Sequence, residues 1–212
     1  MKSLRGVATQ QPIDLKYFVE WRTSLWGPAV RWLLDDPSRF MDKRVLEVGC
    51  RSGRISCLFG LLGAHVTGVD LHGVDLTAAR AEAERWGLAA RVRFANYSGK
   101  PADLPGGEYD FVFAKSVLVI VPELESFLEG LARKMQPEGE LLLAENAGSE
   151  TLYFLRWLYR VVAHRCTRSF RSRFSWVDEQ FLAALSANFD LLESKQFYRL
   201  VVALRARPLP RQ

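Results

Sequence analysis

The sequence of 212 residues predicts an α/β protein: a doubly wound sheet of seven strands, mostly parallel, with helices on both faces. The first observation is that short apolar strands alternate with helical segments of about ten residues between positions 45 and 145, which is typical of right-handed βαβ units. The second is that the strand patterns 189–197 and 199–205 follow each other with no room for a crossover helix. These two strands must therefore pair antiparallel and close the sheet.

The other strands and the helices can be placed from local patterns. Each of the first five strands is a short apolar run bounded by turn residues, and the runs are 45–48, 65–69, 91–95, 109–114 and 141–145. The expected helices are 55–62, 76–86, 123–135, 151–164 and 177–186. Pro137-Glu138-Gly139 is expected to form the turn into the fifth strand. The aromatic residues within positions 1–40 predict one or two short amphipathic helices before the first strand.

Composition predicts one globular domain. The chain is 49% hydrophobic and 25% charged, which excludes disordered and collagen-like proteins. Three cysteines without a CxxC spacing argue against a zinc site or a disulfide framework, and no metal is expected. We expect a cytoplasmic protein, because no signal peptide or membrane-spanning run is evident; peripheral membrane contact stays open, and nothing indicates an oligomeric state. The predicted parts are a helical cap (1–40), a cofactor-binding core (41–150), a basic aromatic insertion (151–177) and a closing helix and hairpin (178–212).

The sharpest local feature is a glycine-bearing turn between the first strand and the helix that follows it. It reads Gly49-Cys50-Arg51-Ser52-Gly53, and glycines in such a turn let the backbone approach a ligand where amides are unpaired. Asp70 ends the second strand, 21 residues after Gly49. At this spacing a nucleoside site places a carboxylate on the ribose hydroxyls. The loop, the acid and the strand order together favour a nucleoside site over a turn that serves the fold alone.

These residues resemble the class I S-adenosylmethionine-dependent methyltransferases. Glu47-x-Gly49 and Gly53 are similar to their first motif, Asp/Glu-x-Gly-x-Gly-x-Gly, and Gly68-Val69-Asp70 is similar to the ribose-binding end of their second strand. Later landmarks around the fourth and fifth strands are Leu104-Pro105, Tyr109-Asp110-Phe111-Val112 and residues 131–139. The resemblance covers about residues 40 to 205 and implies a Rossmann-like fold, S-adenosyl-L-methionine as the cofactor and methyl transfer as the activity.

The resemblance also implies a cofactor pocket. The methionine end would be lined by Glu47, Gly49, Cys50 and Gly53. Asp70 would accept hydrogen bonds from both ribose hydroxyls, and Leu71 would lie on the adenine. Asn96 and Tyr97 would read the adenine edge, because an amide oxygen can accept from the adenine amine. Beneath the sulfonium would lie Ala114 and Lys115.

Two positions depart from the family pattern. Glu138 replaces the first glycine of the usual Pro-Gly-Gly turn, and Arg51 replaces the middle glycine of the first motif. On one interpretation, the Arg51 guanidinium pairs with the methionine carboxylate and belongs to the cofactor site. On the other, Arg51 crowds the loop, and the chain is a non-catalytic or non-methylating protein with this fold.

The segment 151–177 is strongly basic. It holds six arginines, one histidine, seven aromatic residues and no acid. Arg156, Arg160, His164 and Arg168 recur every four residues and would form one stripe on a helix. With Trp176, we interpret this segment as a lid that binds an anionic group of the substrate; the alternative is a solvated helix face whose arginines cover apolar surface. Without the six arginines, the net charge of +5 becomes 23 basic against 24 acidic residues, which disfavours a general affinity for nucleic acid.

The acceptor is expected to be a hydroxyl of a small molecule or a glycan. The chain has neither an Asn-Pro-Pro-Tyr nor an Asp-Pro-Pro-Tyr sequence, so no motif for DNA or amino-group methylation stands out. The stretches 113–118 and 144–146 and the basic segment resemble a methyltransferase branch of surface-glycan biosynthesis, which implies an anionic or lipid-linked acceptor. The alternative is an RNA methyltransferase, favoured by the basic aromatic segment. Candidate bases are His164 and Glu145, the latter expected to face the cleft from the end of the fifth strand.

Overall fold

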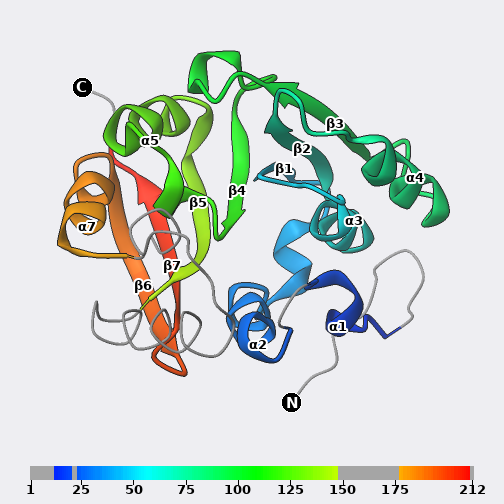
Figure 1. Cartoon of the computed structure of the whole chain (residues 1–212), viewed down its shortest axis with the longest axis horizontal. Helices are drawn as coiled ribbons and strands as arrows, with labels where there is room; N and C mark the ends of the chain where they lie inside the picture. The colour runs from blue at the N-terminus through cyan, green and yellow to red at the C-terminus, as the bar shows by residue number, and fades with distance from the viewer. Residues whose placement is uncertain (1–11, 21–22, 148–176, 211–212) are drawn as a thin grey trace, which may run out of the picture.

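The computed structural model describes residues 12–20, 23–147 and 177–210, and it contains one mixed sheet of seven strands (Figure 1). Along the sheet the order is β3-β2-β1-β4-β5-β7-β6. The strands are β1 (Arg44–Val48), β2 (His65–Leu71), β3 (Val92–Tyr97), β4 (Tyr109–Lys115), β5 (Met135–Asn146), β6 (Phe189–Phe197) and β7 (Val201–Pro208). The pairs among β1 to β5 are parallel, and β7 pairs antiparallel with both β5 and β6. The predicted fold class is confirmed.

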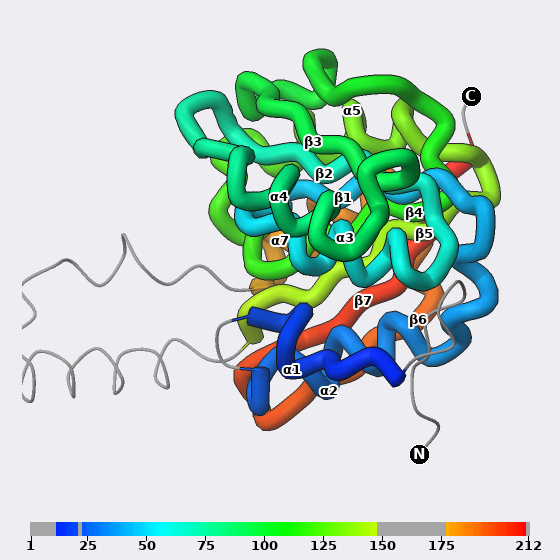
Figure 2. The backbone as a smooth tube through the Cα atoms, turned by 90° about the vertical axis from the view of Figure 1, so that its right-hand side faces the viewer, coloured from blue at the N-terminus to red at the C-terminus, as the bar shows by residue number. Residues whose placement is uncertain are grey.

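Helices cover both faces of this sheet. They are α1 (Leu15–Phe18), α2 (Thr23–Leu33), α3 (Arg54–Leu61), α4 (Thr77–Arg85), α5 (Leu124–Ala132) and α7 (Glu179–Ser186). One apolar core joins α1, α2 and α3 to the sheet, and the other joins α5 and α7 to its opposite face. Figure 2 shows α2 crossing β7 and β6, and Figure 1 shows α5 beside α7.

Strand β1 illustrates how the sequence serves both cores. Val45 contributes to the core under α2 and α3, whereas Leu46 and Val48 contribute to the core under α5 and α7. Successive side chains of a strand point to opposite faces, so a strand buried on both sides is apolar nearly throughout. Glu47 is the exception in β1, and a buried carboxyl in a central strand requires a functional or structural reason.

The order of the strands places the candidate site. From β1 the chain proceeds outward to β2 and β3, and it then returns to the other side of β1 with β4. The carboxyl ends of β1 and β4 therefore flank the point where the strand order reverses, which is where open α/β sheets bind their ligands.

The fifth strand differs from its prediction. It begins at Met135, and α5 already ends at Ala132, three residues before the predicted end. Instead of forming a turn before the strand, residues 136–139 form a bulge within it, between the pairs Tyr109–Met135 and Phe111–Glu140. A Cβ atom at Gly139 would lie 3.0 Å from three backbone oxygens, so the bulge has room only for glycine there.

Two further expectations concern membranes and the insertion. Among residues 12–20, 23–147 and 177–210, no helix has the length and apolar character needed to cross a bilayer. The predicted helix 151–164 lies outside the described residues.

Candidate functional site

The glycine loop, residues 49–53, leaves β1 and enters α3 in a conformation that few residues tolerate. Gly49, Arg51 and Gly53 have φ values of +81°, +44° and +73°, all in the left-handed region. A Cβ at Gly49 would lie 2.4 Å from a methyl of Val117, and one at Gly53 would lie 2.6 Å from the Phe94 ring. The two glycines are thus required both by their backbone angles and by close packing. Arg51 adopts the same kind of angle without being glycine.

Asp70 holds this loop from the end of β2. Its Oδ2 accepts a hydrogen bond from the Arg51 amide at 2.8 Å, and its Oδ1 accepts from the Leu71 amide at 2.9 Å. The side chain is 8% exposed, whereas Leu71 beside it is 49% exposed. The predicted meeting of loop and acid is therefore present in the structure. Each carboxylate oxygen retains a lone pair for a further donor.

The residues expected at the adenine edge have different surroundings. The Asn96 amide nitrogen donates to the carbonyls of Leu71 and Val74 at 2.9 and 3.0 Å, which fixes the turn after β2. The Tyr97 ring is 4% exposed and belongs to the core under α5 and α7. Burial raises the pKa of Tyr97 to about 12. Asn96 is thus placed at the exposed edge of the site, but the Tyr97 ring is not.

The two side chains larger than hydrogen at the predicted methionine end, those of Glu47 and Cys50, are both buried. The Cys50 side chain is 4% exposed and packs with Leu76 and Ala79. Burial raises the pKa of the Cys50 thiol, so this residue is neither a thiolate nucleophile nor a metal ligand. Glu47 accepts a hydrogen bond from the Ser56 hydroxyl of α3, and burial raises its pKa to about 8. Cys50 lies within the glycine loop, and Glu47 lies in β1 directly before it.

Lys115 and Ala114 end β4 on opposite faces. Ala114 is fully buried in the core under α5 and α7. The Lys115 ammonium lies 5.3 Å from the centre of the Trp26 ring of α2. Burial lowers the pKa of Lys115, while the carboxyls of Glu47, Glu20 and Glu145 act in the opposite direction.

Glu145 does not face an open cleft, contrary to the sequence prediction. Its side chain is fully buried, and Oε1 accepts from the amides of Val117 and Leu118 at 3.1 and 2.8 Å. Burial raises its pKa to about 8. The side chain of residue 145 lies on the face of β5 that carries Leu141 and Leu143, because alternate residues of a strand serve opposite faces. Glu145 thus supports the segment after β4 through Oε1, while its Oε2 is buried without a hydrogen-bond partner in the described part of the chain.

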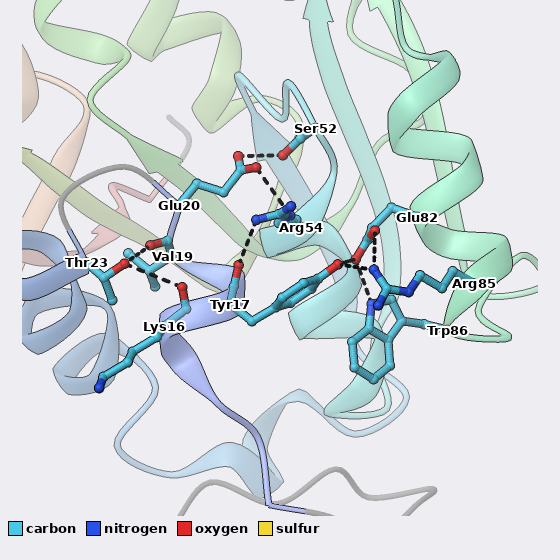
Figure 3. A network of polar contacts seen from close by, with 10 residues as sticks. All are labelled: Lys16, Tyr17, Val19, Glu20, Thr23, Ser52, Arg54, Glu82, Arg85 and Trp86. Atoms are coloured by element: carbon cyan, nitrogen blue, oxygen red, sulfur yellow. Dashed lines mark hydrogen bonds and ion pairs between the residues drawn. The ribbon is translucent and has the colours of Figure 1, made fainter.

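Three residues that were not among the predicted site residues lie around the site: Ser116, Asn146 and Glu20. Ser116, with φ +57°, follows β4, and its hydroxyl accepts a hydrogen bond from the Asn146 amide nitrogen at 3.3 Å. Glu20, before α2, accepts from the Ser52 hydroxyl of the glycine loop at 2.5 Å (Figure 3). The position of Ser116 directly after β4 could have signalled it, but nothing in the sequence connects Glu20 with a loop 32 residues away.

Several predicted residues fall outside the described part of the chain. They are the candidate base His164 and the candidate substrate-binding residues Arg156, Arg160, Arg168 and Trp176. Within the described residues, no group of three or more His, Cys, Asp or Glu side chains could hold a metal ion.

Comparisons with known proteins decide the family. Residues 46–143 match the family described as "Methyltransferase domain". A ubiquinone biosynthesis O-methyltransferase of Rhodopseudomonas palustris (strain BisA53) is 31% identical, over 72% of this chain and 72% of that protein. The chain belongs to the class I S-adenosylmethionine-dependent methyltransferases. Its cofactor is S-adenosyl-L-methionine, as the resemblance implied.

Other relatives of this methyltransferase agree with the fold and define the extent of the match. A ubiquinone biosynthesis O-methyltransferase of Aeromonas salmonicida (strain A449) is 29% identical over 53% of this chain and 47% of that protein. This chain thus spans about half the length of several curated relatives that it matches. A SAM-dependent methyltransferase from Aquifex aeolicus has the same fold, with a TM-score of 0.63 and 17% identity over 93% of this chain and all of that one.

The matched region of this methyltransferase covers all the residues that were predicted to bind the cofactor. It runs from within β1 to within β5, so it contains the glycine loop, Asp70 and the end of β4. It excludes the cap that carries Glu20 and the buried Glu145. The cofactor presents two ribose hydroxyls and an ammonium group, and the carboxyls of Asp70 and Glu47 flank the loop on which such a molecule would lie.

Proposed function

We propose that this methyltransferase transfers the methyl group of S-adenosylmethionine to a hydroxyl oxygen of a small-molecule acceptor. The observation that carries this proposal is the 31% identity with an O-methyltransferase over nearly three quarters of both chains. That relative is named for ubiquinone biosynthesis, so a ubiquinone precursor with a free ring hydroxyl is the first acceptor to test. No relative named above supports the narrower resemblance to the surface-glycan branch.

The nucleoside part of the cofactor is proposed to bind at the end of β2. Asp70 accepts the ribose hydroxyls with the lone pairs that the Arg51 and Leu71 amides leave free. The exposed Leu71 side chain provides an apolar surface for the adenine. Asn96 holds the turn after β2 through its amide nitrogen and directs its oxygen to the adenine edge, and Tyr97 contributes only its buried ring to the core below.

The methionine part is proposed to lie on the glycine loop. Glu47 binds the ammonium group, which favours the ionised form of a carboxyl whose pKa burial raises to about 8. Gly49, Cys50 and Gly53 contribute backbone, because a glycine or a buried thiol leaves only the main chain for the cofactor. The exposed Arg51 side chain pairs with the methionine carboxylate.

The acceptor is proposed to meet the sulfonium at the ends of β4 and β5. There Ala114 and Lys115 end β4, and the bonded Ser116 and Asn146 side chains can orient an acceptor hydroxyl. Methyl transfer forms a carbon–oxygen bond as the carbon–sulfur bond breaks, and the hydroxyl proton leaves to a base or to water. S-adenosylhomocysteine is the second product. Because Glu145 is buried, the base remains proposed to be His164.

The remaining acceptor contacts are proposed from sequence alone. The insertion 151–177, with Arg156, Arg160, Arg168 and Trp176, is proposed to bind an anionic group of the acceptor. We also propose the division of the chain expected from the sequence: a cap (1–40), a core (41–150), an insertion (151–177) and a closing helix and hairpin (178–212). A cytoplasmic location belongs to the same proposal.

A methyl-transfer assay tests the proposed reaction. The purified protein is incubated with S-adenosylmethionine labelled in its methyl group and with one acceptor at a time: a hydroxylated ubiquinone precursor, a sugar nucleotide or a transfer RNA. We expect label in the first acceptor and an O-methyl product by mass spectrometry. Label in the RNA alone would support the RNA methyltransferase alternative, and cofactor binding with no transfer to any acceptor would support the non-methylating alternative.

A further inference from the structure

We propose that Glu20 is a positioning residue for the cofactor site: it fixes the glycine loop from the cap and so couples the order of the cap to cofactor binding. The proposal rests on the proposed cofactor site at residues 49–53. Glu20 lies outside the matched family region, and no sequence motif includes it.

The glycine loop needs external support because of Arg51. A non-glycine residue at φ +44° is strained relative to ordinary backbone, and such a conformation persists only where surrounding contacts enforce it. On one side, the support is the hydrogen bond from the Arg51 amide to Asp70. The Gly49 and Cys50 amides also donate to the Val69 carbonyl of β2, at 2.8 and 3.0 Å, so β2 holds the start of the loop. None of these bonds involves Ser52, towards the other end of the loop.

Glu20 supplies support from the cap, at the end of the loop that β2 does not hold. Its two carboxylate oxygens are divided between neighbouring residues of the loop and helix: Oε2 accepts from the Ser52 hydroxyl at 2.5 Å, and Oε1 lies 3.3 Å from the Arg54 Nε. Ser52 directly follows the strained Arg51, and Arg54 begins α3. Glu20 and Arg54 are 39% and 35% exposed, and an ion pair this exposed adds little to stability. The geometry therefore points to positioning and not to a large contribution to folding.

The cap segment that carries Glu20 is itself anchored to the domain. The Arg54 guanidinium donates to the Tyr17 carbonyl at 3.3 Å and lies 4.4 Å from the centre of the Tyr17 ring. The Tyr17 hydroxyl donates to Glu82 of α4 at 2.5 Å, and Trp86 donates to the same carboxylate at 2.7 Å (Figure 3). Contacts to α4 thus fix the segment at one end while Glu20 reaches the loop at the other.

This arrangement predicts reciprocal coupling. If Glu20 favours the binding-competent loop, a cofactor that selects that loop must also stabilise the cap segment by the same free energy. Cofactor binding should therefore protect the amides of residues 15–20 from hydrogen exchange, and that protection should depend on Glu20.

The test compares variants at the two ends of the cap segment. Glu20→Ala removes the support, and Glu20→Gln keeps an oxygen that can accept from Ser52. Tyr17→Phe loosens the cap segment at its α4 end, because it removes the bond to Glu82 and leaves the Tyr17 ring, its carbonyl and the glycine loop in place. The dissociation constant for S-adenosylhomocysteine is measured by calorimetry, and the melting temperature of each cofactor-free protein is recorded.

We expect Glu20→Ala to weaken binding about tenfold and Glu20→Gln to restore most of the loss. Tyr17→Phe acts only through the order of the cap, so it should lower the melting temperature and weaken binding by a smaller factor. Ser52→Ala should reproduce much of the loss from the loop side, and combining it with Glu20→Ala should cost less than the sum of the two. If wild type binds and Glu20→Ala binds equally well, the inference is overturned while the proposed function stands. If wild type does not bind, the proposed cofactor site is overturned and the inference with it.

Discussion

The loops after β1 and after β4 are built alike but differ in their exposure. In each, a non-glycine residue is left-handed, Arg51 at +44° and Ser116 at +57°. In each, a carboxyl from the next strand accepts hydrogen bonds from loop amides: Asp70 of β2 for the first, Glu145 of β5 for the second. Asp70 retains some exposure, 8%, whereas Glu145 has none.

That difference separates a binding role from a supporting one. A carboxylate at the edge of a site can hold a loop and still accept hydrogen bonds from a ligand. Glu145 is fully buried: Oε1 holds its loop, Oε2 has no hydrogen-bond partner among the described residues, and burial raises its pKa to about 8. Substitution of Asp70 should therefore change binding, and substitution of Glu145 should change stability.

The largest effect is expected for Asp70→Ala. It removes the acceptor proposed for two ribose hydroxyls, and each hydrogen bond to a charged group contributes about 1.5–3 kcal/mol. Calorimetry with S-adenosylhomocysteine should show at least a 100-fold loss, about 3 kcal/mol. Asp70→Asn is the control for loop geometry, because its oxygen can still accept from Arg51. Unchanged affinity in Asp70→Ala would show that the ribose lies elsewhere.

Glu145→Ala should instead destabilise the fold. It leaves the Val117 and Leu118 amides without their buried acceptor, and each such group costs about 1–3 kcal/mol. We expect urea denaturation to show a loss of about 2 to 3 kcal/mol, with methyl transfer retained by the folded fraction. Glu145→Gln preserves an acceptor and should recover most of the stability. A variant that folds normally but cannot transfer methyl would instead support the original hypothesis that Glu145 is the base.

The pH dependence of stability provides a third contrast. The folded-state pKa of Glu145 is about 8 against an ordinary value of 4.5, so the folded protein binds more protons than the unfolded chain between these values. Stability from this group is complete below pH 4.5 and is lost as the pH rises through 8; Glu47 acts in the same direction. Between pH 5 and 9, Glu145→Gln should lose less stability than wild type, by at least about 1 kcal/mol. Parallel curves in urea would contradict this.

The sequence predicts the scaffold more fully than the site. The central strands were found because a strand buried on both faces is apolar nearly throughout, as residues 111–114 of β4 are. The strand β6 is exposed along most of its length and was found from its closeness in sequence to β7. The start of β5 was misplaced because the bulge at residues 136–139 looks locally like a turn. Only the pairing with β4, a contact distant in sequence, makes it part of the strand.

At the candidate site, the sequence predicted contacts between residues that belong to one motif. Gly49 and Asp70 were found because the spacing from loop to acid is local to one βαβ unit. Glu20 was missed because its contact with Ser52 depends on where the cap folds. The burial of Glu145 was also missed, because the amides that it binds belong to the segment after another strand, β4.

The smallest effect concerns Arg51, whose charge and backbone angle have opposite consequences. Arg51→Ala removes the guanidinium but keeps a Cβ at φ +44°, whereas Arg51→Gly removes both. Glycine relieves the strain, so it should be more stable than the alanine variant by about 1 kcal/mol in thermal denaturation.

Cofactor affinity then isolates the charge. If the guanidinium pairs with the methionine carboxylate, both Arg51 variants should bind S-adenosylhomocysteine several-fold more weakly than wild type and by similar factors. Binding of 5′-methylthioadenosine, which lacks that carboxylate, should be unaffected. Tighter binding by both variants would show that Arg51 crowds the loop after β1. That loop would then resemble the loop after β4 in being closed to a ligand as well as in its backbone.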